Sequence, residues 1–268
     1  MDEFLRANQK LWDSLTPIHE KSDFYDMESF LNGKCTIEKI DVRELGDVSG
    51  KSLLHLQCHF GQDTLSWARR GAKVTGVDFS AKAIDLARSL ADKLAIDANF
   101  VCCNLYDLPE HLTGQFDIVY TSGGVISWLP DLEKWGEVVA HFLKPGGIFY
   151  IREFHPTSYI FADDEQDTTP RVHYPYFRPD QPIRFENMGS YADRDADVYN
   201  VNYEWPHSMG EIINSLIDAG LGIEFLHEFP FSTYKSHPFM KKRDDGYWHY
   251  PDKPNSIPFM FSIRATKP

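Results

Sequence analysis

The sequence predicts an α/β fold in which helices cover both faces of a mostly parallel sheet. Between residues 52 and 154, short apolar runs typical of buried strands alternate with amphipathic helical patterns. Such alternation indicates parallel strands joined by right-handed helical crossovers. The first run ends in a tight turn that opens a helix, and the second ends in an acidic residue, as in nucleotide-binding sheets.

Length and charge narrow the class of protein. A chain of 268 residues suffices for one α/β domain with insertions. The formal net charge of -13 repels phosphate backbones and anionic membrane surfaces. No apolar run approaches the ~20 residues that cross a bilayer, and the four cysteines lack metal-ligand spacing. We expect a cytoplasmic protein with buried free thiols, no metal, no nucleic-acid partner and no membrane partner; nothing in the sequence indicates an oligomeric state.

The N-terminal segment, residues 1–48, is expected to cap the domain. Apolar positions over residues 3–15 predict a short helix, which Pro17 is expected to end. The segment that follows mixes aromatic and charged side chains, which suits an ordered stretch lying across the domain.

Five strand-like runs follow, and helical patterns separate most of them. Residues 83–94 and 135–143 each repeat apolar side chains three and four positions apart, so each predicted helix has one apolar face. The five runs are SLLHLQC, KVTGVDF, NFVCCNL, FDIVYTS and GIFYIREF.

After Phe154 the pattern is irregular for about fifty residues and rich in aromatic side chains, which predicts a lid or binding insertion. Its acidic run at residues 163–167 is expected to be a solvated loop. Ser208 and Glu211 form a capping-box signature that opens a last helix. Two further strand-like runs, GIEFLHEF and PFMFSIRAT, flank a second insertion.

Candidate binding residues follow the strands, because ligands of open parallel sheets bind beyond the carboxyl ends of the strands. The turn from Gln57 to Gly61 offers backbone amides and a helix N-terminus that can hold an anionic group. Asp78 follows the second run and is placed to accept hydrogen bonds from both hydroxyls of a ribose. A nucleoside-bearing ligand is predicted, although the turn retains only Gly61 of the dinucleotide fingerprint.

Five motifs resemble, in order and spacing, those of class I S-adenosylmethionine-dependent methyltransferases of the bacterial small-molecule type. They are LHLQCHFG at 54–61, GVDFS at 76–80, NL at 104–105, FDIV at 116–119 and LKPGG at 143–147. The resemblance implies a Rossmann-like three-layer sandwich whose seven-stranded sheet ends in an antiparallel hairpin. It implies one domain over 1–268, with a cap at 1–48, a cofactor-binding core at 50–154, a lid at 155–207 and the last helix and hairpin at 208–268.

The same resemblance implies S-adenosylmethionine as the cofactor and S-adenosylhomocysteine as the product. The turn after the first strand would wrap the methionine part, the acid after the second would bind the ribose, and the following residues would contact the adenine. The end of the fourth strand would line the floor near the methyl group. These positions are Gln57, Cys58, His59, Gly61, Asp78, Phe79, Asn104, Leu105, Thr121 and Ser122.

Three positions around the first turn depart from the family pattern, and Asn104, often an aspartate in the family, departs mildly because an amide can also pair with an adenine. His55 stands where an acidic residue usually helps to hold the ammonium of the methionine part, and a histidine hydrogen-bonded inside the sheet is the alternative role. Gln57 and His59 replace glycines, although histidine is among the residues that tolerate positive φ.

Methyl transfer from a sulfonium is an in-line displacement, so positioning and desolvation can supply much of the catalysis. The fourth strand ends in TSGG and lacks the motif of enzymes that methylate amino groups of adenine or glutamine. We therefore expect a small-molecule acceptor, methylated on oxygen, nitrogen or carbon.

His155, which follows the fifth strand, is the candidate general base, with a purely structural role as its alternative. Tyr25, Tyr159 and Tyr191 are the candidate substrate contacts. Two other functions stay open. The altered turn would suit a non-catalytic regulatory protein that binds S-adenosylmethionine or a nucleoside, whereas the missing glycine fingerprint disfavours a nicotinamide-dependent oxidoreductase.

Overall fold

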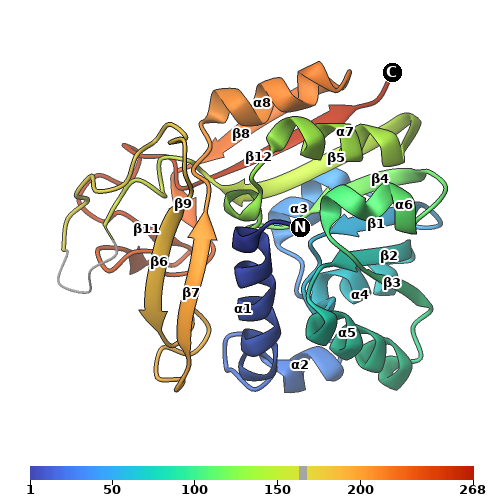
Figure 1. Ribbon diagram of the computed structural model, residues 1–268, viewed down its shortest axis with the longest axis horizontal. Coiled ribbons are helices and arrows are strands. Elements are labelled where there is room, and N and C mark those ends of the chain that lie inside the picture. Colours follow the sequence, from blue (N-terminus) through green and yellow to red (C-terminus); the bar gives the residue numbers. More distant parts are fainter. Residues whose placement is uncertain (163–167) are drawn as a thin grey trace.

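The computed structural model describes residues 1–162 and 168–268, so the acidic run at 163–167, expected to be a solvated loop, lies outside the described residues. Its centre is a seven-stranded sheet with the strand order β3-β2-β1-β4-β5-β12-β8 (Figure 1). Strands β1 to β5 pair in parallel, and β12 runs antiparallel to both of its neighbours. The predicted three-layer sandwich with an antiparallel last strand is thereby confirmed. The seven strands are β1 (Ser52–Leu56), β2 (Lys73–Asp78), β3 (Ala98–Cys102), β4 (Phe116–Thr121), β5 (Leu143–Phe154), β8 (Gly222–Phe229) and β12 (Met260–Thr266).

Successive strand residues point to opposite faces of the sheet, and two apolar cores form in consequence. Leu54 and Leu56 of β1 belong to the core beneath α6, α7 and α8, whereas Leu53 belongs to the core beneath α3 and α4. A third cluster joins α4 to α5 around Phe100 of β3. The helices and 3-10 turns along the sheet are α3 (Lys39–Leu45), α4 (Gln62–Arg69), α5 (Ala81–Leu94), η1 (Leu105–Asp107), α6 (Leu108–His111), η2 (Ile126–Trp128), α7 (Leu132–Phe142) and α8 (Met209–Asp218).

The helix termini are capped as their sequences suggest. The side chain of Ser208 accepts a hydrogen bond from the backbone of Glu211, whose side chain in turn accepts from the backbone of Ser208, so the predicted capping box opens α8. Ser80 caps α5 and Asp131 caps α7 more simply, each by accepting one hydrogen bond from a backbone N–H of the first turn, that of Ala83 and that of Lys134.

The N-terminal helix is longer than expected. Helix α1 (Glu3–His19) runs through Pro17, which was expected to end it. Proline removes one backbone donor, but the last turn continues because Thr16 accepts from the backbone of Glu20 and the buried His19 packs under the rest of the domain. The short α2 (Met27–Leu31) follows and buries Phe30.

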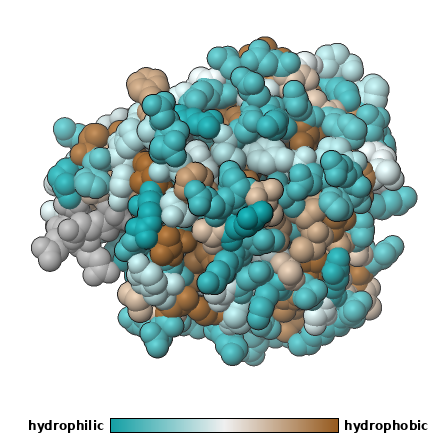
Figure 2. All heavy atoms as spheres, in the orientation of Figure 1, coloured by the Kyte–Doolittle hydropathy of each residue, from teal (hydrophilic) through white to brown (hydrophobic). Residues whose placement is uncertain are grey.

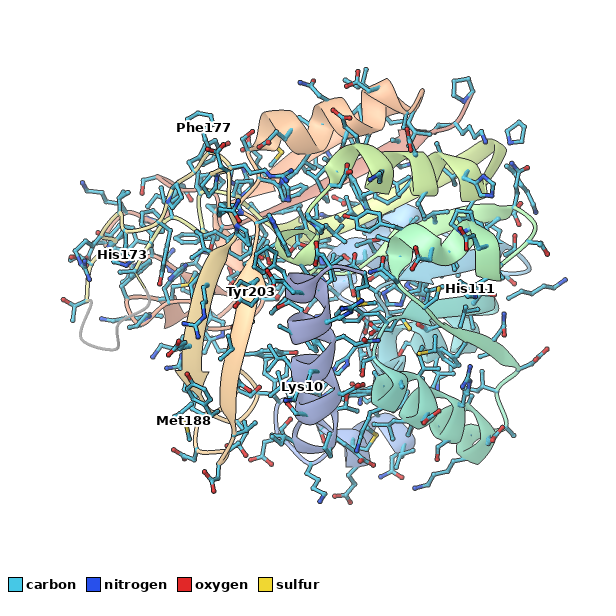
Figure 3. All side chains as sticks on the ribbon, in the orientation of Figure 1. Lys10, His111, His173, Phe177, Met188 and Tyr203 are labelled. Atoms are coloured by element: carbon cyan, nitrogen blue, oxygen red, sulfur yellow. The ribbon has the colours of Figure 1, made fainter. Side chains whose placement is uncertain are left out.

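The first insertion contains a hairpin that the irregular sequence pattern did not predict. Strands β6 (Ile183–Met188) and β7 (Tyr199–Glu204) pair antiparallel and stand beside α1 (Figure 1). The buried positions of β7 are Asn200 and Asn202, so no apolar alternation marks the strand. Asn8 of α1 donates to the carbonyl of Tyr203 at 2.7 Å and accepts from its N–H at 2.9 Å. Figure 3 shows Tyr203 beside α1, and these two bonds fasten the hairpin to the helix.

The second insertion forms a small three-stranded sheet. Its strands are β9 (Phe231–Ser232), β10 (Lys241–Lys242) and β11 (Trp248–His249). It packs against the first insertion through Phe161, Phe239 and Phe259, which share a buried apolar cluster. Phe161 of the first insertion and Phe239, Trp248 and Tyr250 of the second therefore serve a minor core.

The surface is mostly polar. On the face drawn in Figure 2, hydrophobic residues form small separate patches among hydrophilic ones. The four cysteines are free, as expected, but only Cys58 is buried, whereas Cys35 and Cys102 are exposed. Within residues 1–162 and 168–268, no helix combines the length and apolar character that a membrane crossing requires.

Candidate functional site

A cavity of about 920 Å³ lies at the carboxyl edge of the parallel strands. Its floor comes from the turn after β1 and from the ends of β2 to β5. Its walls come from α1, the segment around α2, and both insertions. The cavity thus lies where a parallel sheet holds its ligands, and segments that are far apart in the sequence enclose it.

Nine of the ten positions expected to contact the cofactor line this cavity. The exception is Thr121, whose side chain is fully buried and whose hydroxyl oxygen has no hydrogen-bond partner in the part of the chain that the structure describes. The nine lining residues are Gln57, Cys58, His59, Gly61, Asp78, Phe79, Asn104, Leu105 and Ser122.

The turn after β1 keeps a glycine-like backbone without its usual glycines. Gln57 has φ of 54°, His59 has φ of 50° and Gly61 has φ of 78°. For Gln57 and His59 this conformation costs roughly 1–2 kcal/mol each. A side chain is excluded at Gly61, because its Cβ would lie 2.8 Å from the ring of Phe100. The expectation that His59 tolerates positive φ is confirmed, and Gln57 does so as well.

Asp78 braces the turn as well as facing the cavity. One carboxylate oxygen accepts from the N–H of His59 at 2.8 Å, and the other accepts from the N–H of Ser80 at 2.9 Å. Each oxygen keeps a second lone pair, so both can also accept from a ligand hydroxyl. Burial raises the pKa of Asp78 to about 6 despite these hydrogen bonds.

The free hydrogen-bonding groups of the cavity fit a nucleoside that carries a polar tail. Asp78 offers acceptors for a diol, and the Oδ1 of Asn104 is engaged by the N–H of Tyr106, which leaves its amide nitrogen without a bond to the described residues. In the turn, Oε1 of Gln57 and Nδ1 of His59 are buried without a partner in the described chain. Buried polar atoms of this kind suit a ligand that brings its own polar groups.

His55 is a neutral histidine held inside the site. Its Nδ1 lies 2.8 Å from Oγ1 of Thr64, and its Nε2 lies 3.2 Å from Oγ of Ser122. Burial lowers the pKa of His55 to about 3, so the ring carries no charge at neutral pH. Both nitrogens are therefore occupied by hydroxyl groups of the protein.

Charged side chains that the sequence analysis did not select also line the cavity. Asp63 is the second residue of α4, and Arg152 lies near the end of β5. Oγ1 of Thr36 donates to Oδ1 of Asp63 at 2.5 Å, and Nε of Arg152 donates to Oδ1 of Asp41 at 2.6 Å. Asp63 follows Gly61 by two residues, which was the available sequence signal; nothing in the sequence marked Arg152.

The N-terminal segment and the first insertion meet the turn after β1 through a series of side-chain contacts. Nδ1 of His19 lies 3.0 Å from Nε2 of His59, and Nε2 of His19 lies 2.6 Å from Oγ of Ser190. The hydroxyls of Tyr25 and Tyr191 are hydrogen-bonded to each other. The end of α1, the segment before α2 and the loop between β6 and β7 therefore meet beside the turn after β1.

The three tyrosines expected to contact the substrate all line the cavity, namely Tyr25, Tyr159 and Tyr191. Burial is the largest cause that raises the pKa of each phenol above its usual value. At neutral pH they remain protonated hydroxyls, which are hydrogen-bond donors rather than bases.

Glu153 shapes the segment that follows β4. Its carboxylate accepts from the backbone N–H groups of Gly124, Val125 and Ile126 at 2.5, 2.8 and 3.1 Å, and from that of Phe154 at 2.6 Å. Gly124 and Val125 line the cavity. The buried carboxylate therefore holds one wall in place.

His155 is not brought to the cavity. It is absent from the lining residues, and its Nδ1 accepts from the N–H of Thr157 at 3.1 Å. Its Nε2 lies 2.8 Å from Oε1 of Glu228 on β8. The candidate base thus belongs to the packing between β5 and the closing strands, because the chain turns away from the cavity after Phe154.

Comparisons with known proteins agree with this geometry. Residues 53–147 match a family model described as a methyltransferase domain. The chain is 24% identical over 205 residues to a ubiquinone biosynthesis O-methyltransferase of Chromobacterium violaceum, covering 72% of this chain and 81% of that protein. It is 32% identical over 120 residues to the enzyme of the same name from Alkalilimnicola ehrlichii, covering 44% and 48%.

A crystal structure of an S-adenosylmethionine-dependent methyltransferase from Mesorhizobium loti shares the fold. It superposes with a TM-score of 0.57 at 21% identity, over 88% of this chain and 100% of that one.

Proposed function

We propose that this chain, a class I S-adenosylmethionine-dependent methyltransferase, transfers the methyl group of its cofactor to a small-molecule acceptor bound in the same cavity. The observation that carries the proposal is the size and enclosure of that cavity. At about 920 Å³ it lies at the upper end of small-ligand pockets, which span roughly 300–1,000 Å³. It has room for a nucleoside and a small molecule together, and α1 and both insertions contribute its walls, which narrows the access for a folded macromolecule.

The residues at the floor would hold the cofactor. Asp78 would accept the ribose hydroxyls, and Asn104 with Phe79 would contact the adenine. The turn from Gln57 to Gly61 would enclose the methionine part. Support comes from the free lone pairs of Asp78 and from the unpartnered polar atoms of the turn.

The cofactor supplies a methyl group already activated by a sulfonium, so the protein has to place an acceptor atom in line with it. Ser122 and Gly123 would form the floor of that place. Tyr25, Tyr159 and Tyr191 would contact the acceptor from the lid side, exclude water and donate hydrogen bonds.

No step is assigned to His155, because its ring nitrogens face Thr157 and Glu228 rather than the cavity. Methyl transfer by positioning alone is therefore the mechanism that we propose. The relatives above are named as O-methyltransferases, so hydroxyl-bearing acceptors are the first class to test. The non-catalytic alternative is not favoured, because the curated relatives are enzymes.

The test combines binding with product detection. Calorimetry measures the affinities for S-adenosylmethionine and S-adenosylhomocysteine, and a small-molecule extract is then incubated with methyl-deuterated cofactor and analysed by mass spectrometry. A labelled metabolite that is missing with Asp78→Ala supports the proposal. Absence of binding at millimolar ligand, or tight binding without any labelled metabolite, would overturn it.

A further inference from the structure

We propose that Asp63 and Arg152 form the site for the α-amino-acid group of the cofactor, in which Asp63 takes the ammonium and Arg152 takes the carboxylate. The inference rests on the proposed function. The negative charge that the family pattern places at position 55 would here come from Asp63 in the first turn of α4, and Arg152 of β5 would add a cationic partner.

The need for such a site follows from His55. A neutral imidazole offers no charge to an ammonium, and both nitrogens of His55 already contact hydroxyls of Thr64 and Ser122. An ammonium placed here without a carboxylate would lose its hydration and gain no comparable interaction with the protein. Another side chain must therefore supply the negative charge.

Asp63 has the required position and a free oxygen. It lines the cavity at the N-terminus of α4, directly after the turn. Its Oδ1 accepts from Thr36, while its Oδ2 has no hydrogen bond or ion pair within the described residues. Burial raises the pKa of Asp63 above its ordinary value, so a cationic ligand would favour the ionised carboxylate.

Arg152 is held so that one end of its guanidinium is open. Its Nε donates to Asp41, and Asp41 also accepts from the hydroxyls of Tyr120 at 2.8 Å and Tyr150 at 3.2 Å. The two terminal nitrogens of Arg152 make no hydrogen bond to the residues that the structure describes, although Arg152 lines the cavity. A planar guanidinium presented in this way matches a carboxylate with two parallel hydrogen bonds.

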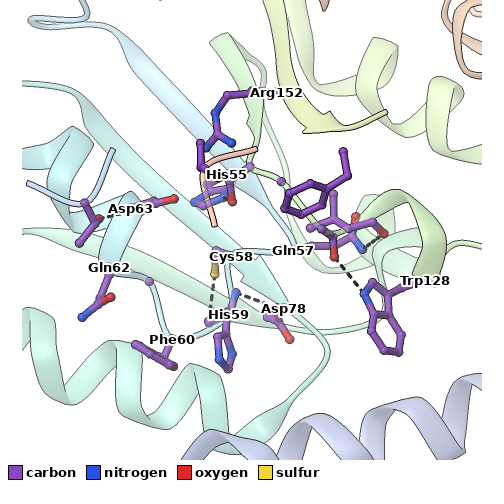
Figure 4. A pocket seen from close by; sticks show the side chains of 18 of the residues that line it. His55, Gln57, Cys58, His59, Phe60, Gln62, Asp63, Asp78, Trp128 and Arg152 are labelled. Carbon is purple, nitrogen blue, oxygen red and sulfur yellow. Dashed lines mark hydrogen bonds between the residues drawn. The ribbon is translucent and has the colours of Figure 1, made fainter. Parts of the chain in front are cut away.

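The two side chains belong to the same end of the cavity. Figure 4 shows Asp63, His55 and Arg152 around that end, with His59 and Asp78 beyond Cys58. Burial raises the pKa of Asp63 and of Glu38, a third charged group of the lining, and the positive charge of Arg152 opposes that rise at both carboxyls. One cation facing two carboxylates suits a ligand end that carries an ammonium, a carboxylate and a nearby sulfonium.

An acceptor that is itself an amino acid would offer the same chemistry, so the test must separate the two sources. Calorimetry is done with S-adenosylhomocysteine and with 5′-methylthioadenosine, which keeps the nucleoside and lacks the amino-acid group. With Asp63→Asn, we expect the affinity for S-adenosylhomocysteine to fall about 10- to 100-fold, as for loss of a charge-assisted hydrogen bond. The affinity for 5′-methylthioadenosine should stay within about twofold.

Arg152→Lys keeps a positive charge beside the buried Asp41 but loses the paired N–H groups of the guanidinium. It should therefore also lose affinity for S-adenosylhomocysteine and keep its affinity for 5′-methylthioadenosine. Deaminated S-adenosylhomocysteine gives a check that does not depend on folding of a variant. Its affinity for the unaltered chain should be as low as that of Asp63→Asn for the complete ligand, and Asp63→Asn should bind both ligands equally. Asp26→Asn is the control, because Asp26 also lines the cavity but is paired with Lys34, and it should bind both nucleosides normally.

The outcomes are distinct. Equal losses for both nucleosides would assign Asp63 a structural role and overturn the inference. Unchanged binding of both nucleosides together with lost methyl transfer would assign the pair to the acceptor and also overturn it. If the unaltered chain binds 5′-methylthioadenosine and S-adenosylhomocysteine equally well, the amino-acid site is absent while the proposed function stands; if it binds no cofactor or product, the proposed function itself fails.

Discussion

Nδ1 of His19 lies 3.0 Å from Nε2 of His59, and this contact joins the last turn of α1 to the turn that follows β1. His19 extends the connection to Ser190, so the loop between β6 and β7 is tied to the same point. Burial lowers the pKa of both imidazoles, and both are therefore neutral at pH 7. A single imidazole, that of His19, thus links the loop between β6 and β7 to the floor of the cavity.

His19→Gln should lower the free energy of unfolding by about 1–2 kcal/mol at pH 7.5, because two buried hydrogen bonds are lost. In the folded chain the pKa of His19 is about 4, whereas in the unfolded chain it is about 6.5. As the pH falls from 6.5 towards 4, the unfolded chain binds a proton that the folded chain does not. The free energy of unfolding of the unaltered protein therefore falls by up to ~1.4 kcal/mol per pH unit. The difference between protein and variant should therefore shrink at pH 5.

Urea denaturation at pH 7.5, 6 and 5 measures this difference. The exposed His111 (Figure 3) provides the control His111→Gln, which should change the free energy of unfolding by less than about 0.5 kcal/mol at pH 7.5. A gap for His19→Gln that is the same at all three pH values would contradict the expectation.

Binding of 5′-methylthioadenosine should weaken as the pH falls through about 6, the pKa of Asp78 in the folded chain. The ionised carboxylate accepts hydrogen bonds from both ribose hydroxyls, and protonation turns one acceptor into a donor. Below the pKa, Kd should rise by up to about tenfold per pH unit, as measured by calorimetry between pH 8 and 5. Asp78→Asn should bind weakly without this pH dependence; the same slope in the variant would assign the titration to another group.

Glu153→Gln should lower the free energy of unfolding by about 2–4 kcal/mol, because an amide group would face four backbone donors that now share a carboxylate. Urea denaturation at pH 7.5 tests the change. Glu137→Gln alters an exposed glutamate of α7 and should stay within about 0.5 kcal/mol. Similar small effects for both variants would rule out the bracing role of Glu153.

Gly136→Ala should destabilise the chain by about 1–3 kcal/mol, because its Cβ would lie 2.3 Å from the carbonyl oxygen of Ser215 where α7 crosses α8. Gly210→Ala is the matched control in α8, where the nearest atom lies 3.8 Å away. Alanine favours the helix there, so the free energy of unfolding of this variant should rise by about 0.5–1 kcal/mol. Thermal or urea unfolding compares the two, and a gain for both would mean that the helices can move apart.

The central sheet could be predicted because its strands are buried on both faces and therefore form nearly continuous apolar runs. The same topology places the turn after β1 and Asp78 at one edge, which is why the predicted positions converge on the cavity. The β6–β7 hairpin could not be predicted, since its inward side chains are asparagines that bond to backbone and side-chain groups instead of forming an apolar stripe.

His155 shows that the direction of a side chain after a strand could not be predicted from the sequence. A residue that follows a strand lies near the ligand edge, but its direction depends on how the chain turns, and here the ring meets Glu228 of β8. Asp63 and Arg152 illustrate the converse, because their relation to His55 depends on helix α4 and strands β1 and β5 packing together.

The α/β fold, the sheet edge that holds the ligand and the acidic residue expected at the ribose could all be inferred from the sequence alone, because they follow from strand periodicity and from motifs within short segments. The folded arrangement was needed to see that His19 joins His59 to Ser190, that His55 is neutral, and that Asp63 and Arg152 lie near it. Charge state and hydrogen bonding depend on burial and on neighbours from distant parts of the chain, and packing alone brings those neighbours together.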